Sequence, residues 1–314
     1  SRRQDHSSFQ DFTMSALRSP ANQGVLLAFL ASAAFSMKAV FVKLAYRYGV
    51  DAVLLLALRM AFSLPVLAAA AWWSGRVAAT PLTRKDAGLL LFLGTVGYYL
   101  SSILDFWGLH YITAGLERLI LFLYPTVVVL LSVFMFGQSI SKRALLAMAI
   151  SYVGIGIAFL HDMQTTTDHQ GTVFGGFLVF LCMITYAIYL VGNGQLVGRI
   201  GAIRLAAWAS IIAALCCILH FIVVDHVADA FNQPWQVYAY SLAMASLSTV
   251  LPIFMTAKAI QLVGASKVSI VGSIGPVATI FFGWLFLSEA ISLPQMIGAA
   301  FVLGGVMLVS SKKA

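Results

Sequence analysis

Long apolar stretches alternate with short polar breaks along almost the whole chain. Each stretch approaches the length of about 20 residues that an α-helix needs to cross a bilayer. The breaks carry charge or turn residues, as in Ser74-Gly75-Arg76 and Ser292-Leu293-Pro294. The pattern predicts membrane-spanning helices near residues 24–45, 52–73, 87–109, 116–136, 143–160, 175–196, 203–224, 238–260, 267–287 and 294–311.

The second half of the chain repeats the first half. A shift of 151 residues, without gaps, places Phe35 on Tyr186, Pro125 on Pro276, Gln138 on Glu289 and Gly154 on Gly305. The chain is therefore predicted to hold five helices in each of two copies. The predicted organisation is a polar N-terminal extension (1–19), a first five-helix repeat (20–161), a connecting loop (162–170) and a second five-helix repeat (171–314).

An odd number of crossings in each copy predicts that the two repeats are inverted in the membrane. Basic residues in short loops mark the cytoplasmic side. Most of them fall on one side if both termini are cytoplasmic: Arg2, Arg3, Arg18, Arg76, Arg84, Lys85, Lys142, Arg143, Arg199, Arg204, Lys267, Lys312 and Lys313. The loops predicted for the other side hold mainly acids and histidines, with Arg47 as the main exception.

Composition supports an all-α integral membrane protein. Hydrophobic residues make up 61% and charged residues 10% of the 314 positions, whereas about 25% of residues are charged in soluble domains. The formal net charge of +8 is explained by the cytoplasmic loops and anionic lipid, so no nucleic-acid partner is expected. The expected location is the inner (plasma) membrane of a bacterium.

Inverted repeats are typical of secondary transporters, in which the substrate site lies near the midplane between the two halves. Two repeats of one design supply two related conformations of one cavity, which is what alternating access needs. The alternatives from other classes are a channel, a non-transporting membrane scaffold and an intramembrane enzyme.

The repeated motif resembles the EamA repeat of the drug/metabolite transporter superfamily. Its residues run from Trp107 to Gly115, with Pro125 and Gln138, and again from Lys258 to Ser266, with Pro276 and Glu289. The resemblance extends from about Gln23 to Ser310. It implies ten helices, cytoplasmic termini and transport, usually export, of small metabolites. Two positions depart from the family pattern: Gln138 stands where the repeat usually has glutamate, and Phe35 and Tyr186 stand where the first helix of each repeat usually has tryptophan.

Ionisable residues within the spans are the first candidates for a substrate site, because charge is costly in the membrane. Lys38 is the deepest of them, while Arg59 and Arg118 lie toward the outer ends of their spans. A third-span stripe of Tyr98, Ser102 and Asp105 has helical spacing and shares one face. The repeat places Thr249 and Thr256 opposite its first and last members. The resulting candidate substrate-binding set is Lys38, Arg59, Tyr98, Ser102, Asp105, Arg118, Tyr186, Tyr189, Thr249, Ser269 and Ser273.

Each of these residue types also has a structural interpretation. Arg59, Asp105, Glu117 and Arg118 could neutralise one another in ion pairs that fix helix packing, and Glu117 and Arg118 are expected near the interface. The tyrosines could serve packing, and the serines close helix contact. Pro125, Pro252 and Pro276 are expected to kink or interrupt their helices.

Several chemistries find no support in the chain. It has no GxxxxGK[ST] loop for nucleotide phosphates and no HExxH or paired-cysteine metal motif, so neither a cofactor nor a metal is expected. The three cysteines, Cys182, Cys216 and Cys217, fall within spans and form no disulfide framework. Residues 1–13 are interpreted as an extension before a natural start at Met14.

Deep basic residues outnumber deep acids, which favours a carboxylate-bearing organic anion as cargo. Lys38 is expected to bind the carboxylate, with Asp105 as the neighbouring acid that neutralises the empty site or takes a coupling proton. Amino acids, drugs and other metabolites are the alternative cargoes. The sequence leaves open whether transport is coupled to a proton or to a counter-substrate, and whether the protein is a monomer or a homodimer.

Overall fold

The computed structural model describes residues 19–77, 80–137 and 139–310. The described part is mostly helical and contains no strand. The first copy holds α2 (Pro20–Tyr46), α3 (Ala52–Val77), α4 (Arg84–Phe92), α5 (Leu100–Gly108), α6 (Ala114–Leu121), α7 (Tyr124–Phe136) and α8 (Lys142–Thr165). The second holds α9 (His169–Ile200), α10 (Ala202–Val224), α11 (Trp235–Ala245), α12 (Leu251–Val263), α13 (Ala265–Gly272), α14 (Gly275–Phe282) and α15 (Leu293–Ser310).

The helical segments coincide with the ten predicted spans. Within the described residues, nine segments are long and apolar enough to cross a membrane, and the tenth, Leu293–Leu308, is shorter. The connection between the two copies is shorter than the predicted loop of 162–170, because α8 continues to Thr165 and α9 begins at His169. The Asp168 side chain caps α9 by accepting a hydrogen bond from the Gly171 N–H.

Two features recur at matching positions of the copies. The third segment of each copy contains a π-helical turn, η1 (Leu93–Tyr99) between α4 and α5 and η3 (Ser246–Val250) between α11 and α12. The fourth segment of each copy is interrupted, at residues 122–123 and again at 273–274. Pro125 and Pro276 follow these interruptions at the start of α7 and α14, where the missing N–H of proline does least harm to the helix. Pro252 is also near a helix start, in α12, but there the backbone continues from η3 without a gap.

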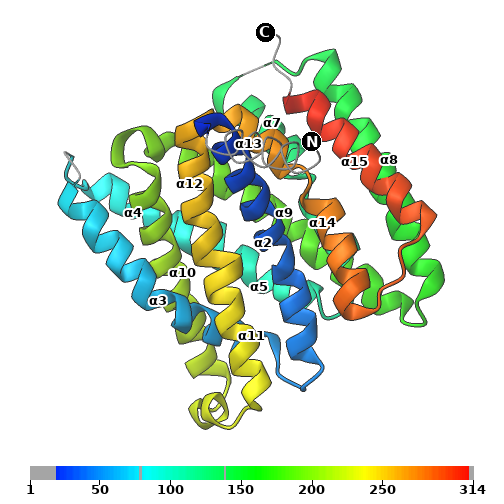
Figure 1. Ribbon diagram of the computed structural model, residues 1–314, viewed down its shortest axis with the longest axis horizontal. Coiled ribbons are helices and arrows are strands. Elements are labelled where there is room, and N and C mark those ends of the chain that lie inside the picture. Colours follow the sequence, from blue (N-terminus) through cyan, green and yellow to red (C-terminus); the bar gives the residue numbers. More distant parts are fainter. Residues whose placement is uncertain (1–18, 78–79, 138, 311–314) are drawn as a thin grey trace, which may run out of the picture.

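Helices of one copy pack mainly on helices of the other. α2 packs on α12, α5 on α9, α3 on α10, α6 on α14, and α8 on α15. Figure 1 shows α8 and α15 as a pair at one edge of the bundle, with α2, α5 and α9 near its middle. The chain therefore folds as one interlocked bundle rather than as two separate units.

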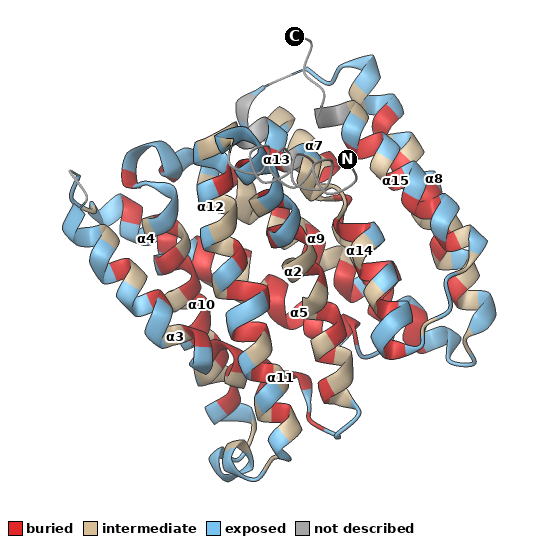
Figure 2. Ribbon diagram, viewed as in Figure 1, coloured by how far each residue is buried: buried red, intermediate tan, exposed pale blue. Residues whose placement is uncertain are grey.

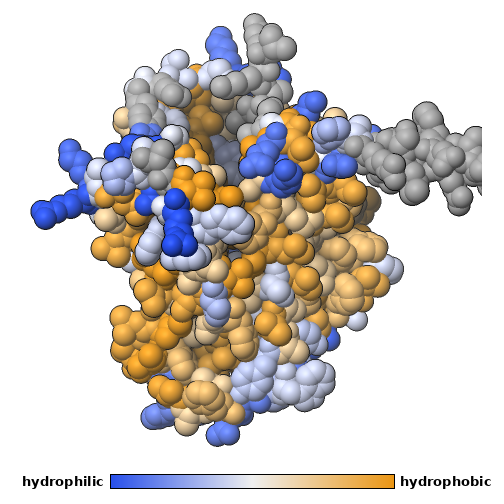
Figure 3. All heavy atoms as spheres, turned by 60° about the vertical axis from the view of Figure 1, so that its left-hand side comes forward, coloured by the Kyte–Doolittle hydropathy of each residue, from blue (hydrophilic) through white to orange (hydrophobic). Residues whose placement is uncertain are grey.

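Apolar side chains cover much of the outside of this bundle. Trp72, Trp73, Phe134 and Trp235 are each more than half exposed, and Figure 2 shows exposed positions along the outer faces of the helices. Figure 3 shows a broad hydrophobic belt with hydrophilic residues gathered above and below it. A surface of this kind suits hydrocarbon rather than water.

The bundle has two polar ends of different character. The described ends of the chain, the start of α2 and the end of α15, lie on the same side of the bundle (Figure 1); this side is called the terminal side below. There Arg199 forms an ion pair with Asp86. At the opposite end, desolvation and the neighbouring charges of Asp51 and Asp229 raise the pKa of Asp225 above its ordinary value.

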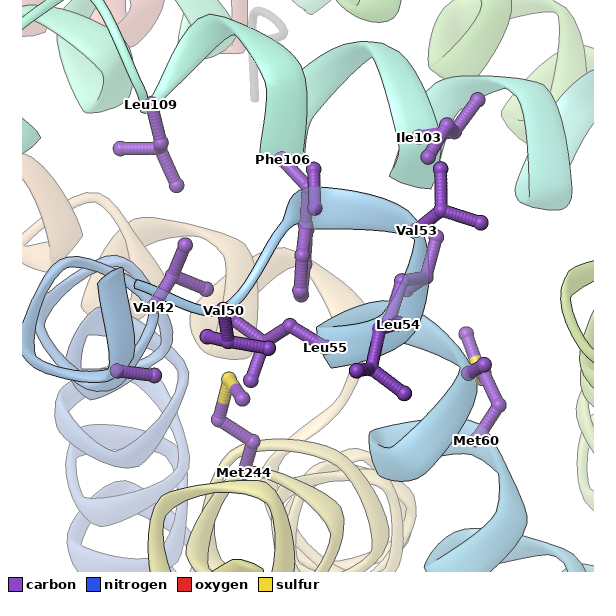
Figure 4. Close-up of a cluster of buried hydrophobic side chains, with 14 of the residues drawn as sticks. Val42, Val50, Val53, Leu54, Leu55, Met60, Ile103, Phe106, Leu109 and Met244 are labelled. Carbon is purple, nitrogen blue, oxygen red and sulfur yellow. The ribbon is translucent and has the colours of Figure 1, made fainter. Parts of the chain in front are cut away.

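The largest cluster of buried apolar residues fills the half of the bundle opposite the terminal side. Figure 4 shows Val42 of α2, Leu55 of α3, Phe106 of α5 and Met244 of α11 converging in it. We call this cluster the apolar seal.

Candidate functional site

A cavity of about 360 Å³ lies between the two copies. In α2 the residues that line it are Ala28, Ser32, Phe35 and Lys38, which follow one another at helical spacing and form one stripe. The residues that follow directly, from Ala39 to Ala45, instead contribute to the apolar seal. The cavity therefore occupies the terminal side of the bundle and ends against the seal.

Most of the predicted site residues line this cavity: Lys38, Arg59, Tyr98, Ser102, Asp105, Arg118, Tyr186 and Ser273. Tyr98, Ser102 and Asp105 share one wall, as their spacing predicts. Thr249 lies just behind the wall and contacts Arg59. Tyr189 packs between Tyr98 and Tyr186, with ring centroids 5.8 and 6.1 Å away. The side chain of Ser269 lies outside the described part of the structure, as does Gln138.

Several residues of the lining were not among the predicted site residues, including Ser32, Phe35, Tyr124 and Cys182. Ser32 and Phe35 carried a detectable signal, because they continue the stripe that ends at Lys38. Arg59 of α3, which was among the predicted site residues, and Val306 of α15, which was not, also line the cavity.

Lys38 forms the centre of a buried charge cluster. Its Nζ lies 2.5 Å from Asp105 Oδ2 and 3.1 Å from Glu117 Oε1. The Lys38 side chain is 14% exposed, that of Asp105 4% and that of Glu117 0%. Lys38 and Asp105 are therefore in direct contact, while the role of Asp105 as a neutralising acid or a proton acceptor stays a prediction. Glu117 forms its ion pair with Lys38 rather than with Arg59 or Arg118, because α6 points this carboxylate inward.

The two arginines of the cavity have no such partner. Among the described residues, no carboxylate lies within 4.0 Å of the Arg59 or Arg118 side-chain nitrogens. Arg59 donates two hydrogen bonds of 3.1 Å to Thr249 Oγ1 and is 5% exposed. Arg118 Nε is buried without a hydrogen-bond partner, and its guanidinium lies 5.7 Å from the ring centroid of Phe122.

Local structure explains how the cavity wall is held at the break between α13 and α14. Pro276 cannot donate the helical hydrogen bond that would reach the carbonyl of Gly272. Ser32 Oγ donates to that carbonyl at 2.9 Å, and Ser36 Oγ donates to the Gly275 carbonyl at 3.0 Å. Side chains of α2 therefore satisfy the freed Gly272 carbonyl and also hold the start of α14, which fixes this wall against the helix that carries Lys38.

A second polar cluster lies beyond Lys38, on the side of the seal. Lys43 Nζ lies 3.7 Å from Glu289 Oε1 and donates to the Ile112 carbonyl at 2.6 Å. Glu289 Oε1 also accepts a hydrogen bond of 3.1 Å from the Ala114 N–H at the start of α6. The acidic residue that ends the repeated motif in the second copy thus caps a helix of the first copy.

The described residues contain no group of three or more histidine, cysteine, aspartate or glutamate side chains that would suit a metal ion. The chemistry at hand is binding rather than bond-breaking: two unpaired guanidinium groups, a lysine with two carboxyls, and an aromatic wall. Tyr124 and Tyr186 form part of that wall, with ring centroids 5.5 Å apart.

Known proteins resemble this chain along nearly its whole length. The pattern of the EamA-like transporter family matches twice, at residues 22–160 and 173–311. The uncharacterized transporter YcbK of Bacillus subtilis is 28% identical over 303 residues, with 92% of each chain covered. The uncharacterized transporter YetK of the same organism is 24% identical over 233 residues, covering 74% of this chain and 70% of YetK.

The fold also has a counterpart among solved structures. A protein crystal structure superimposes with a TM-score of 0.63 at 18% identity, covering 91% of this chain and 95% of the other. The family pattern, present in both copies of the repeat, identifies the protein as a multi-pass membrane transporter rather than an enzyme. The chain belongs to the EamA-like transporter family of the drug/metabolite transporter superfamily.

Proposed function

We propose that the protein is a secondary transporter that exports a small carboxylate-bearing organic anion across a bacterial inner membrane. Its ten segments would all cross the membrane, as two inverted repeats of about 20–161 and 171–314, with both termini in the cytoplasm. The pairing of helices supports the inversion: α2 with α12 and α5 with α9 are the first span with the eighth and the third with the sixth. The first and sixth spans are counterparts in the repeat, as are the third and eighth. A two-fold rotation that exchanges the copies therefore converts one helix pair into the other.

The cargo class is supported by one observation. The cavity holds two arginines, Arg59 and Arg118, without a carboxylate partner among the described residues. A guanidinium in a partly apolar cavity is stabilised by an anion, and its planar donors match a carboxylate. The unsatisfied Nε of Arg118 makes this residue the first contact we assign to the cargo.

An amino acid is the second candidate cargo, since it also carries a carboxylate. Its ammonium group would need an acidic partner in the cavity. Asp105 and Glu117 already contact Lys38, so an ammonium group would compete with an ion pair that is in place. This competition favours an organic anion over an amino acid.

A thermal-shift screen of the purified protein tests the cargo class. A ligand that binds only the folded state raises the melting temperature. We expect organic acids to do so, and amino acids and polyamines to have smaller effects. Arg118→Gln should abolish the shift, whereas Arg76→Gln, which changes an arginine stacked on Trp72 outside the cavity, should retain it. Stabilisation by polyamines alone would contradict an anionic cargo.

A further inference from the structure

The charge cluster around Lys38 does not balance. One ammonium group faces two carboxyl groups, and both carboxyls are nearly or completely buried. One oxygen of each carboxyl contacts the same Lys38 nitrogen, at 2.5 and 3.1 Å. The two carboxyls therefore also lie close to each other. Two carboxylates at such a separation repel each other unless one of them is protonated.

Among the described residues, no second cation forms an ion pair with either carboxyl. Lys43 of α2 is engaged with Glu289 and the Ile112 carbonyl, and Arg59 of α3 with Thr249. Arg118 of α6 follows Glu117 in the chain and attracts its carboxylate from a distance, but no ion pair within 4.0 Å joins it to a described acid. On α9, the nearby groups are the neutral Cys182 and Tyr186.

Each carboxyl also has one oxygen without a partner. Asp105 Oδ1 and Glu117 Oε2 are buried and accept no hydrogen bond from the described residues. An unpaired buried carboxylate oxygen costs free energy, and a proton removes that cost in two ways. It cancels the excess charge, and it gives one carboxyl an O–H group that can donate a hydrogen bond to the other carboxyl.

We propose that Asp105 and Glu117 form a proton-binding site, held in place by Lys38, in which the two carboxyls share one proton. The site lies in the wall of the cavity, since Lys38 and Asp105 both line it. A proton there removes a negative charge from the wall and so favours an anion at Arg118. By linkage, an anion at Arg118 favours the proton. This last step rests on the proposed function, whereas the site itself does not.

Infrared spectroscopy of the purified full-length protein tests the site without a substrate. A protonated carboxyl has a carbonyl stretching band that a carboxylate lacks. We expect this band at neutral pH in the native protein. Both Glu117→Gln and Asp105→Asn should remove it, because each leaves one carboxylate on one lysine. The matched control is Glu289→Gln, in which the lost glutamate is paired one-to-one with Lys43; the band should persist there.

A third variant, Lys38→Gln, tests the site by the same infrared band if a carboxyl variant fails to fold. It leaves two carboxyls without a cation, so the band should grow. The site is overturned if the native protein shows no such band, or if either carboxyl variant folds and keeps it. The outcome is separate from that of the ligand screen: an organic acid may stabilise a protein without the band, and the band can be present in a protein that binds no organic acid.

Discussion

Cations in the cavity differ in what surrounds them, and that difference decides which of them can meet a substrate. Lys38 has two carboxyl contacts, Arg59 a threonine hydroxyl and Arg118 a phenylalanine ring. Removal of one partner from a buried ion pair leaves an uncompensated charge and costs about 3–5 kcal/mol. Lys38 is therefore a structural cation as well as a candidate ligand, which changes what its substitution should do.

Lys38→Gln should destabilise the protein as well as impair transport. It leaves Asp105 and Glu117 facing each other without a cation, and we expect a cost of about 3 kcal/mol, the low end of the range for a broken buried pair, since proton uptake offsets part of it. The variant Lys38→Gln with Asp105→Asn and Glu117→Gln removes all three charges and should regain most of the loss. Thermal melting in detergent measures both. Equal melting of Lys38→Gln and the native protein would show that Lys38 carries no such structural role.

The sequence predicted the members of this site better than their pairing. Lys38 and Asp105 stand out because each is an ionisable group deep in an apolar run, and depth can be counted along one helix. The contact of Glu117 with Lys38 was not predicted, because the direction of this side chain depends on where α6 packs. That position is set by contacts between segments, such as the Glu289 cap on Ala114, which are 175 residues apart in sequence and leave no periodic signal.

At the scale of elements, the ten apolar runs were enough to locate the helices, while their internal irregularities were not all predictable. Pro125 and Pro276 predicted the two interruptions of the fourth segments. For the π-helical turn η3 (Ser246–Val250), Pro252 gives such a signal, because it lies two residues further on and cannot donate the α-helical hydrogen bond to the Ser248 carbonyl. The turn η1 (Leu93–Tyr99) has no proline within it or directly after it. The recurrence of these two turns at matching positions of the copies is visible only in the fold.

Close contact between α8 and α15 depends on particular glycines. A Cβ at Gly154 would lie 2.6 Å from the Gly298 carbonyl, and one at Gly305 2.6 Å from the Ala147 carbonyl. A Cβ at the neighbouring Gly156 or Gly304 would meet nothing within 4 Å.

Alanine substitutions at these positions should therefore separate into two groups. Gly154→Ala and Gly305→Ala push the helices apart, and overpacking of this kind costs about 1–3 kcal/mol. Gly156→Ala and Gly304→Ala, one or two residues away, should be neutral or stabilising by up to about 1 kcal/mol, since alanine favours the helix. Melting temperatures of the four variants measure the difference. If Gly154→Ala and Gly156→Ala changed the melting temperature equally, and Gly305→Ala and Gly304→Ala did so too, a tight contact between α8 and α15 would be excluded.

At the scale of the whole molecule, the proposed inversion fixes which loops face the cytoplasm. Cysteines placed at Gln164 and Ala228 should react with a membrane-impermeant thiol reagent from outside the cell, whereas cysteines at Ser141 and Ala202 should not. Native Cys182, Cys216 and Cys217 are first replaced by alanine, so that only the introduced thiol is labelled. Labelling of Ser141 from outside would overturn the cytoplasmic assignment of the termini.

Transport by alternating access would require the apolar seal to open, so the contacts beside it should be broken in the second state. Three of them join α2 to other segments: Lys43 with Glu289, the Tyr46 hydroxyl with the Phe106 carbonyl at 2.5 Å, and Arg47 with the Leu287 carbonyl at 3.1 Å. These are contacts of the state described here, in which the cavity lies on the terminal side. Weakening one of them should shift the population toward a state open on the opposite side.

Glu289→Gln provides that test, because glutamine can still accept the hydrogen bond from the Ala114 N–H but no longer carries the charge that attracts Lys43. The two side chains are 24% and 16% exposed, so we expect a modest effect of about 1 kcal/mol, roughly a fivefold shift in population. A cysteine at Val53, inside the seal, should then be labelled from outside about fivefold faster. Asp86→Asn is the matched control, since it removes the ion pair with Arg199 on the terminal side and should slow that labelling or leave it unchanged. Faster labelling in Asp86→Asn but not in Glu289→Gln would mean that the Lys43–Glu289 contact does not hold the seal closed.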